Sequence, residues 1–116
     1  MSIKIFGIPN CNTVKKARDW LSSNNISYEF VDFKKQEPTE PQLQDWLGKV
    51  ELEELINRKG TTWRSLSVEQ QQLAQTQAGA IELMISKPSV IKRPVLQSDD
   101  QMMLGFDDMK YANFFK

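Results

Sequence analysis

Cys11 is the residue in this chain with the clearest capacity for covalent chemistry, and it is the only cysteine among 116 residues. A thiolate attacks disulfides and other electrophiles directly. The chain contains no histidine, so Ser-His-Asp and Cys-His mechanisms are excluded. One cysteine and no histidine leave neither an internal disulfide nor a zinc site of the usual kind, and we predict no metal. Any activation of the thiol must come from its local structure.

The sequence around Cys11 predicts such a structure. The stretch "SIKIF" alternates in hydropathy as a strand does, and "GIPN" then interrupts it. From Cys11 onward the apolar residues Val14, Ala17 and Leu21 recur with the spacing of a helix. Cys11 is therefore expected at a strand-to-helix turn.

The start of a helix stabilises negative charge, because its first N–H groups lack internal partners and its dipole is positive there. A thiolate at Cys11 therefore needs no histidine. The amides of Asn12, Thr13 and Val14 are candidates for holding an oxyanion or a second sulfur. The alternative is a buried structural cysteine, which is common for free thiols. A loop of Gly, Pro and Asn favours the reactive interpretation.

Two arginines are candidates for binding an anionic substrate. Arg58 lies in "LINRKG", at the expected end of a helix, and Arg93 lies directly before Pro94 among apolar neighbours. A guanidinium suits planar oxyanions and carboxylates. The alternative for each is a solvated charge or a structural ion pair with an acid such as Asp32.

The remaining elements define the fold class. "ISYEFVDF" predicts a second strand, parallel to the first across a right-handed crossover. "VIKRPVL" is rich in β-formers but contains Pro94, which suits an edge strand, a strand start or a special turn. "MMLGF" predicts a last strand, and Asp107 can cap a final helix carrying Tyr111. The acidic residues near this end are interpreted as turn and cap residues rather than a metal site: Asp99, Asp100, Asp107 and Asp108.

The middle of the chain predicts four short helices. Thr39 and the "SVEQ" that starts at Ser67 are N-terminal caps, and Gly48 and Gly60 mark two ends. The predicted order of secondary-structure elements is βαβ, then the four helices, then ββα. We predict an α/β fold in a single domain of residues 1–116, with a helical insertion at approximately residues 38–88.

Composition limits the partners. Lys and Arg total 15 and so do Asp and Glu, giving a formal net charge of zero. This balance argues against direct nucleic-acid binding, which needs a basic field. No apolar stretch has the length that a membrane helix needs, and the N-terminus lacks the features of a signal peptide. A cytoplasmic location without membrane association is the expectation.

Several blocks of the sequence resemble the arsenate-reductase-like (ArsC/Spx) family, closest to its YffB branch. They are "IFGIPNCNTVKKARDWL", "VDFKK", "LINRKGTTWR" and "IKRPVL" followed by "LGF". The resemblance runs almost end to end. It implies a thioredoxin-like fold with a helical insertion, and a cis peptide bond before Pro94, which in such folds faces the active-site cysteine. It also implies that Cys11 is the nucleophile and that Arg58 and Arg93 close on its pocket.

The first function that the resemblance implies for this site is arsenate reduction. In the arsenate reductases a cysteine attacks arsenate, three arginines hold the oxyanion, and glutathione with glutaredoxin completes the reduction. Arg58 and Arg93 match two of the arginines, but Gly105, Phe106 and Asp107 occupy the region of the third. This departure favours glutathione, or a disulfide substrate such as a glutathionylated protein, with glutathione as co-substrate and no permanently bound cofactor.

The Spx branch is the non-enzymatic alternative. Its members bind the RNA polymerase α subunit and use a Cys-x-x-Cys redox switch. This chain has Val14 at the second position, so the switch cannot form. A monothiol can still form a mixed disulfide with glutathione or a partner.

Overall fold

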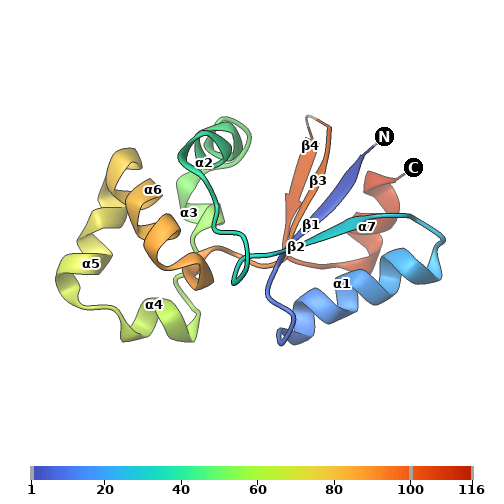
Figure 1. The fold of residues 1–116 in the computed structure, drawn as a ribbon, viewed down its shortest axis with the longest axis horizontal. Helices are drawn as coiled ribbons and strands as arrows, with labels where there is room; N and C mark the ends of the chain where they lie inside the picture. The colour runs from blue at the N-terminus through green and yellow to red at the C-terminus, as the bar shows by residue number, and fades with distance from the viewer. Residues whose placement is uncertain (1, 100, 116) are drawn as a thin grey trace. The chain divides into compact units, whose positions relative to one another are not determined.

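The computed structural model describes residues 2–99 and 101–115 and divides the chain into two compact units. The first unit is Met1–Lys35 with Arg93–Lys116, and the second is Gln36–Lys92. Both appear in Figure 1. The predicted order of βαβ, then helices, then ββα is confirmed.

The first unit is a mixed sheet with helices on one face (Figure 1). Its strands run in the order β2-β1-β3-β4, with β1 parallel to β2, and with β3 antiparallel to both β1 and β4. Pro94 stands directly before β3, so of the predicted alternatives it marks a strand start. The elements are β1 (Ile3–Gly7), α1 (Asn12–Ser23), β2 (Glu29–Asp32), β3 (Val95–Ser98), β4 (Gln101–Leu104) and α7 (Asp108–Phe114).

A single apolar cluster holds α1 and α7 against this sheet. The predicted face of α1, namely Val14, Ala17 and Leu21, is fully buried. It packs with side chains of β1 and β3 and with Tyr111 of α7. Burying an aliphatic side chain of this size contributes about 1.5–3 kcal/mol, so this cluster fixes the position of α1 on the sheet.

The second unit is helical, and its caps are those that the sequence predicts. The Thr39 hydroxyl accepts the Gln42 amide at 3.3 Å, and Ser67 forms a capping box with Gln70. The structure has one helix more than predicted, because α4 follows Gly60. The elements are α2 (Glu40–Leu47), α3 (Leu52–Leu55), α4 (Thr61–Ser65), α5 (Val68–Gln72), α6 (Gln77–Ser86) and the 3-10 helices η1 (Leu73–Gln75) and η2 (Pro88–Val90).

Backbone hydrogen bonds tie together two distant segments of the second unit. Ile56 and Ile91 form an antiparallel bridge. The Asn57 amide donates to the Val90 carbonyl at 2.8 Å, and the Lys92 amide donates to the Leu55 carbonyl at 2.7 Å. The segment after α3 is therefore extended backbone and not a continuation of the helix.

Candidate functional site

One edge of the sheet gathers the segments that the sequence singles out. Phe6 pairs with Val95, Gly7 with Asp32, and Val95 with Leu104. The end of β1, the end of β2, the start of β3 and the end of β4 therefore share this edge. The loop to Cys11, the Arg93–Pro94 pair and the turn after β4 all leave from here.

Cys11 lies at the N-cap of α1, where the sequence predicts it. Its backbone is extended, with φ −108° and ψ 124°, and its carbonyl accepts the Lys15 amide at 3.0 Å. The side chain is free of disulfides, partly exposed, and in contact with the core cluster of the first unit. A wholly buried, structural thiol is therefore not what the structure shows.

The first turn of α1 is open to a ligand. Among the described residues no side chain caps this helix, so its first amides have no intrahelical acceptor. Asn12 and Thr13 are exposed, whereas the Val14 side chain points into the core. Burial of the Val14 side chain therefore fixes the position of the three predicted backbone amides, those of Asn12, Thr13 and Val14.

Gly7 allows that first turn to pack directly on the end of β1. A methyl group added to Gly7 would lie only 2.7 Å from Cγ2 of Val14, which is fully buried and β-branched.

We expect Gly7→Ala to lower the free energy of unfolding by about 1–3 kcal/mol through overpacking. Urea unfolding of Gly7→Ala, Val14→Ala and the double variant measures the loss of unfolding free energy. Removing the Val14 methyl groups should relieve the clash, so the two losses should not add in the double variant. Strictly additive losses would contradict the proposed clash.

Pro94 meets the expectation that concerns its peptide bond, whereas the approach of Arg93 to the Cys11 pocket remains a prediction. The peptide bond between them is cis, as the resemblance implied. Pro94 is buried, and its carbonyl accepts the Gly105 amide at 2.9 Å. Arg93 is half-buried and forms no ion pair with Asp32, whose Oδ1 instead accepts the Lys34 amide at 2.9 Å. The ion-pair alternative for Arg93 and Asp32 is therefore wrong.

The turn after β4 is packed rather than cationic. The Phe106 ring meets Tyr111 edge-on at 4.8 Å between centroids. The buried Tyr111 hydroxyl donates to the Gly105 carbonyl at 3.2 Å. Gly105 has φ 76°, a conformation that side chains rarely adopt. This turn thus connects α7, through Gly105, to the carbonyl of Pro94.

Tyr111 makes the stability of this turn dependent on pH. Burial raises the pKa of its hydroxyl, whereas the unfolded chain loses that proton near pH 10. The folded state binds the proton more tightly, so the free energy of unfolding falls above about pH 10 by up to about 1.4 kcal/mol per pH unit.

We expect Tyr111→Phe to lower the free energy of unfolding by about 1–3 kcal/mol at pH 7, because the Gly105 carbonyl loses its donor. The variant should also lose less stability than the parent between pH 10 and pH 11. Urea unfolding at pH 7 and pH 11 tests both, and an unchanged alkaline slope would contradict the assignment.

Arg58 lies elsewhere than predicted. The helix expected to reach Gly60 ends at Leu55, and Arg58 occupies a turn before α4. Its side chain is exposed, and the guanidinium lies 5.4 Å from the centre of the Trp63 ring. Arg58 belongs to the second unit, and its approach to Cys11 remains a prediction.

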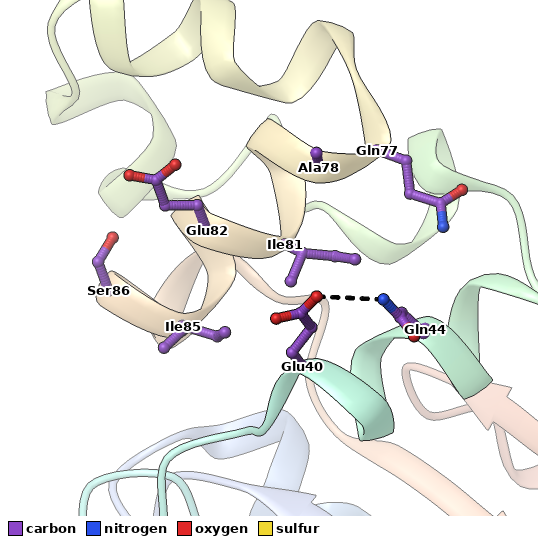
Figure 2. A pocket seen from close by; sticks show the side chains of 8 residues that line it. All are labelled: Glu40, Gln44, Gln77, Ala78, Ile81, Glu82, Ile85 and Ser86. Carbon is purple, nitrogen blue, oxygen red and sulfur yellow. Dashed lines mark hydrogen bonds between the residues drawn. The ribbon is translucent and has the colours of Figure 1, made fainter.

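A hollow of about 670 Å³ lies between α2 and α6 within the second unit. Figure 2 shows Ile81 and Ile85 directed toward Glu40 of α2, whose carboxylate accepts a hydrogen bond from the side-chain Nε2 of Gln44 at 3.2 Å. Glu82 is a second carboxylate in the lining, and no lysine or arginine lines this hollow. It is therefore unsuited to anionic ligands such as arsenate or a carboxylate.

The acidic residues near the C-terminus behave as caps and turns. The Asp107 carboxylate accepts the Lys110 amide at 3.1 Å and caps α7. Asp99 has φ 53° in the turn after β3, and Asp100 lies outside the described residues. Residues 2–99 and 101–115 contain no group of three metal-ligating side chains. In the same ranges no helix is both long and apolar enough to cross a membrane.

Several known proteins are similar to this chain in sequence or in structure. A solved structure named YFFB protein superposes with a TM-score of 0.90 at 38% identity, covering 97% of each chain. An arsenate reductase (ArsC) related protein from Brucella melitensis is 43% identical, covers 100% of this chain and 96% of that one, and has a TM-score of 0.76. The global transcriptional regulator Spx of Streptococcus pyogenes serotype M6 is 23% identical over 114 residues, which cover 97% of this chain and 84% of the regulator.

These similarities confirm the predicted thioredoxin-like fold. They cover 97% and 100% of this chain, and so extend over both units. The model of the ArsC family matches residues 6–114, nearly the whole chain. The chain belongs to the ArsC family.

Proposed function

We propose that the protein is a cytoplasmic thiol-dependent oxidoreductase in which Cys11 exchanges disulfides with glutathione-bearing substrates. The observation that carries the proposal is the position of Cys11. It is partly exposed at the N-cap of α1, on the sheet edge that also holds Arg93 and the cis peptide bond to Pro94. The amides of Asn12, Thr13 and Val14 supply positive potential at the reacting sulfur.

The reaction requires two exchanges, because the chain has no second cysteine. In the first, the Cys11 thiolate attacks the glutathione sulfur of a mixed disulfide. A bond forms between these two sulfurs, the substrate's S–S bond breaks, and the substrate leaves as a thiolate that takes up a proton. In the second, reduced glutathione attacks the glutathione sulfur of the adduct. This step releases oxidised glutathione and restores Cys11, alone or with glutaredoxin as partner.

Arginine side chains supply the specificity for anionic substrates in this proposal. Arg93 is half-buried at the sheet edge from which the cysteine loop leaves, and it forms no ion pair among the described residues. A guanidinium in this state retains its donors for a carboxylate or an oxyanion. Arg58 completes the pair, as the family resemblance implies.

Arsenate reduction is the second candidate, since a relative with 43% identity is named as related to an arsenate reductase. The packing of Phe106 against Tyr111 argues against it, because the region expected to provide the third cation holds an aromatic core contact. A regulator of the Spx type, binding the RNA polymerase α subunit, is the non-enzymatic alternative, and it is favoured by the similarity to Spx along 97% of this chain.

Mass spectrometry of the intact protein after incubation with oxidised glutathione tests the proposal. We expect one glutathione adduct per chain at Cys11, removed by excess reduced glutathione. Arsenate turnover with glutathione and glutaredoxin, measured in parallel, should be weak. Brisk arsenate turnover would instead support the second candidate, and no adduct at Cys11 would contradict the oxidoreductase.

A further inference from the structure

Two cations follow Cys11 along one side of α1. Lys15 and Arg18 stand four and seven residues after the cysteine, a spacing that places them on the same helical face. At a rise of 1.5 Å per residue they lie about 6 Å and about 10.5 Å further along the helix axis. This side of α1 flanks the buried face formed by Val14, Ala17 and Leu21.

A small hollow lies beside these cations. It has a volume of about 170 Å³ and lies entirely within the first unit. This is smaller than the roughly 300–1,000 Å³ of sites that enclose a drug-sized ligand, so it has room for one end of a molecule. Its lining comes from the loop before Cys11, from α1 and from the approach to β2: Pro9, Lys15, Arg18, Asp19 and Tyr28.

Arg18 is held in one orientation. Its Nε donates to the Tyr28 hydroxyl at 3.1 Å. Its guanidinium carbon lies 4.1 Å from the centre of the Phe30 ring and 5.8 Å from that of Tyr28. Because Nε is occupied, the edge formed by the two Nη groups remains for a carboxylate, which a guanidinium binds with two parallel hydrogen bonds.

The charged side chains that line the hollow form no ion pairs among the described residues. Across residues 2–99 and 101–115, neither Lys15 nor Arg18 is in an ion pair, and Asp19 joins neither of them. The hollow thus offers two cations and one carboxylate within two turns of a helix. This arrangement is complementary to an α-amino acid group, in which a carboxylate and an ammonium share one carbon atom.

We propose that this hollow binds the zwitterionic α-amino acid end of a thiol substrate whose sulfur reacts at Cys11. The γ-glutamyl end of glutathione has this chemistry. Its α-carboxylate binds Arg18 and Lys15, and its ammonium binds Asp19. Seven bonds separate its α-carbon from the sulfur, an extended reach of about 9 Å with standard bond lengths, which falls between the axial offsets of about 6 Å and about 10.5 Å of Lys15 and Arg18 from Cys11. The inference rests on the proposed function, since it names the substrate end that the thiol site recognises.

Binding can be tested without any reaction at sulfur. We titrate the Cys11→Ser variant with S-methylglutathione and follow the Arg18 Nε–H and the amides around Lys15 and Tyr28 by NMR. Saturable shifts confined to this side of α1 are expected. Arg18→Gln in the same background should weaken the affinity at least about 5-fold. Arg18→Lys should not restore it fully, because an ammonium lacks the paired donors.

Kinetics test the link to Cys11. We measure adduct formation from oxidised glutathione and from the uncharged 2-hydroxyethyl disulfide. Arg18→Gln should slow the first reaction about 10-fold, and Lys15→Gln and Asp19→Asn about 3-fold each, with less than a 2-fold change in the second. The matched control is Lys16→Gln, which removes an exposed cation from a different face of the same helix. Lys15 is also exposed, so its variant remains informative if the Arg18 variants fail to fold.

The outcomes separate the two proposals. Equal slowing of oxidised glutathione by the Arg18, Lys15 and Lys16 variants would overturn the subsite while leaving the thiol chemistry intact. Absence of S-methylglutathione shifts at this hollow would also overturn it. Failure of Cys11 to react with either disulfide, together with normal S-methylglutathione binding, would overturn the proposed function and keep the subsite.

Discussion

Cys11→Ser is expected to abolish formation of the glutathione adduct completely, because the variant contains no thiol that could form a mixed disulfide. A serine hydroxyl is not ionised near neutral pH and cannot replace a thiolate as nucleophile. The loss should be purely chemical. Cys11 is the N-cap of α1 and makes no capping hydrogen bond itself. Serine is a preferred residue at that position, so the variant should keep or slightly exceed the parent stability, within about 1 kcal/mol.

Stopped-flow measurement of adduct formation, alongside urea unfolding, checks both halves of this expectation. A variant that unfolds more easily than the parent would show that Cys11 has a packing role at this site. A glutathione adduct on the well-folded variant would contradict the assignment, because the chain has no other cysteine. A stable complex with the RNA polymerase α subunit that survives the substitution would favour the regulatory alternative.

Removing both arginines is expected to have the second-largest effect. Arg93→Ala and Arg58→Ala should each slow reaction with oxidised glutathione about 10-fold, and together about 100-fold, since each loses a charge-assisted contact of roughly 1.4 kcal/mol. The uncharged 2-hydroxyethyl disulfide should react at nearly the parent rate. The reason is electrostatic, because neither side chain is consumed by an ion pair within the described residues.

A lysine elsewhere in the first unit provides a matched control for the loss of positive charge. Lys110 is an exposed cation on α7, so Lys110→Ala removes the same charge from the first unit without touching the cysteine loop. Mixed disulfide that forms equally well in all arginine variants would contradict the role of both. An effect confined to Arg93→Ala would remove Arg58 from the site and leave the sheet-edge arrangement unaffected.

Much of the secondary structure of both units can be predicted from the sequence because its signals are local. The alternation before Gly7 and the helical spacing of Val14, Ala17 and Leu21 correctly predict β1 and the buried face of α1. The caps at Thr39, Ser67 and Asp107 are found in the structure as expected. Each of these features depends on residues a few positions apart, so propensity and capping chemistry are sufficient.

The failures concern features that depend on distant contacts. The helix before Arg58 stops at Leu55 because Ile56 pairs with Ile91, thirty-five residues later. The extra helix α4 has five residues and no buried face, so it has no apolar period to detect. The three tryptophans also differ in burial. Trp46 is fully buried, but Trp20 and Trp63 are only partly so, and Trp63 stacks with Arg58.

The candidate site shows the same division. The positions of Cys11 and Pro94 at element ends can be predicted from the sequence, but their common sheet edge requires the pairing of Phe6 with Val95. The hollow beside Lys15 and Arg18 was missed, although their spacing from Cys11 was visible. What completes it is the contact of Arg18 with Tyr28 and Phe30, which depends on how β2 packs beside α1.

The most direct test of the central claim is the rate of Cys11 alkylation by iodoacetamide at pH 7, measured by mass spectrometry. The claim is that the start of α1 makes Cys11 an activated nucleophile. We expect Cys11 to be alkylated at least about 5-fold faster than the thiol of free glutathione, and more slowly in Arg93→Ala, since the guanidinium adds to the positive potential. A rate equal to or below that of free glutathione would contradict the claim.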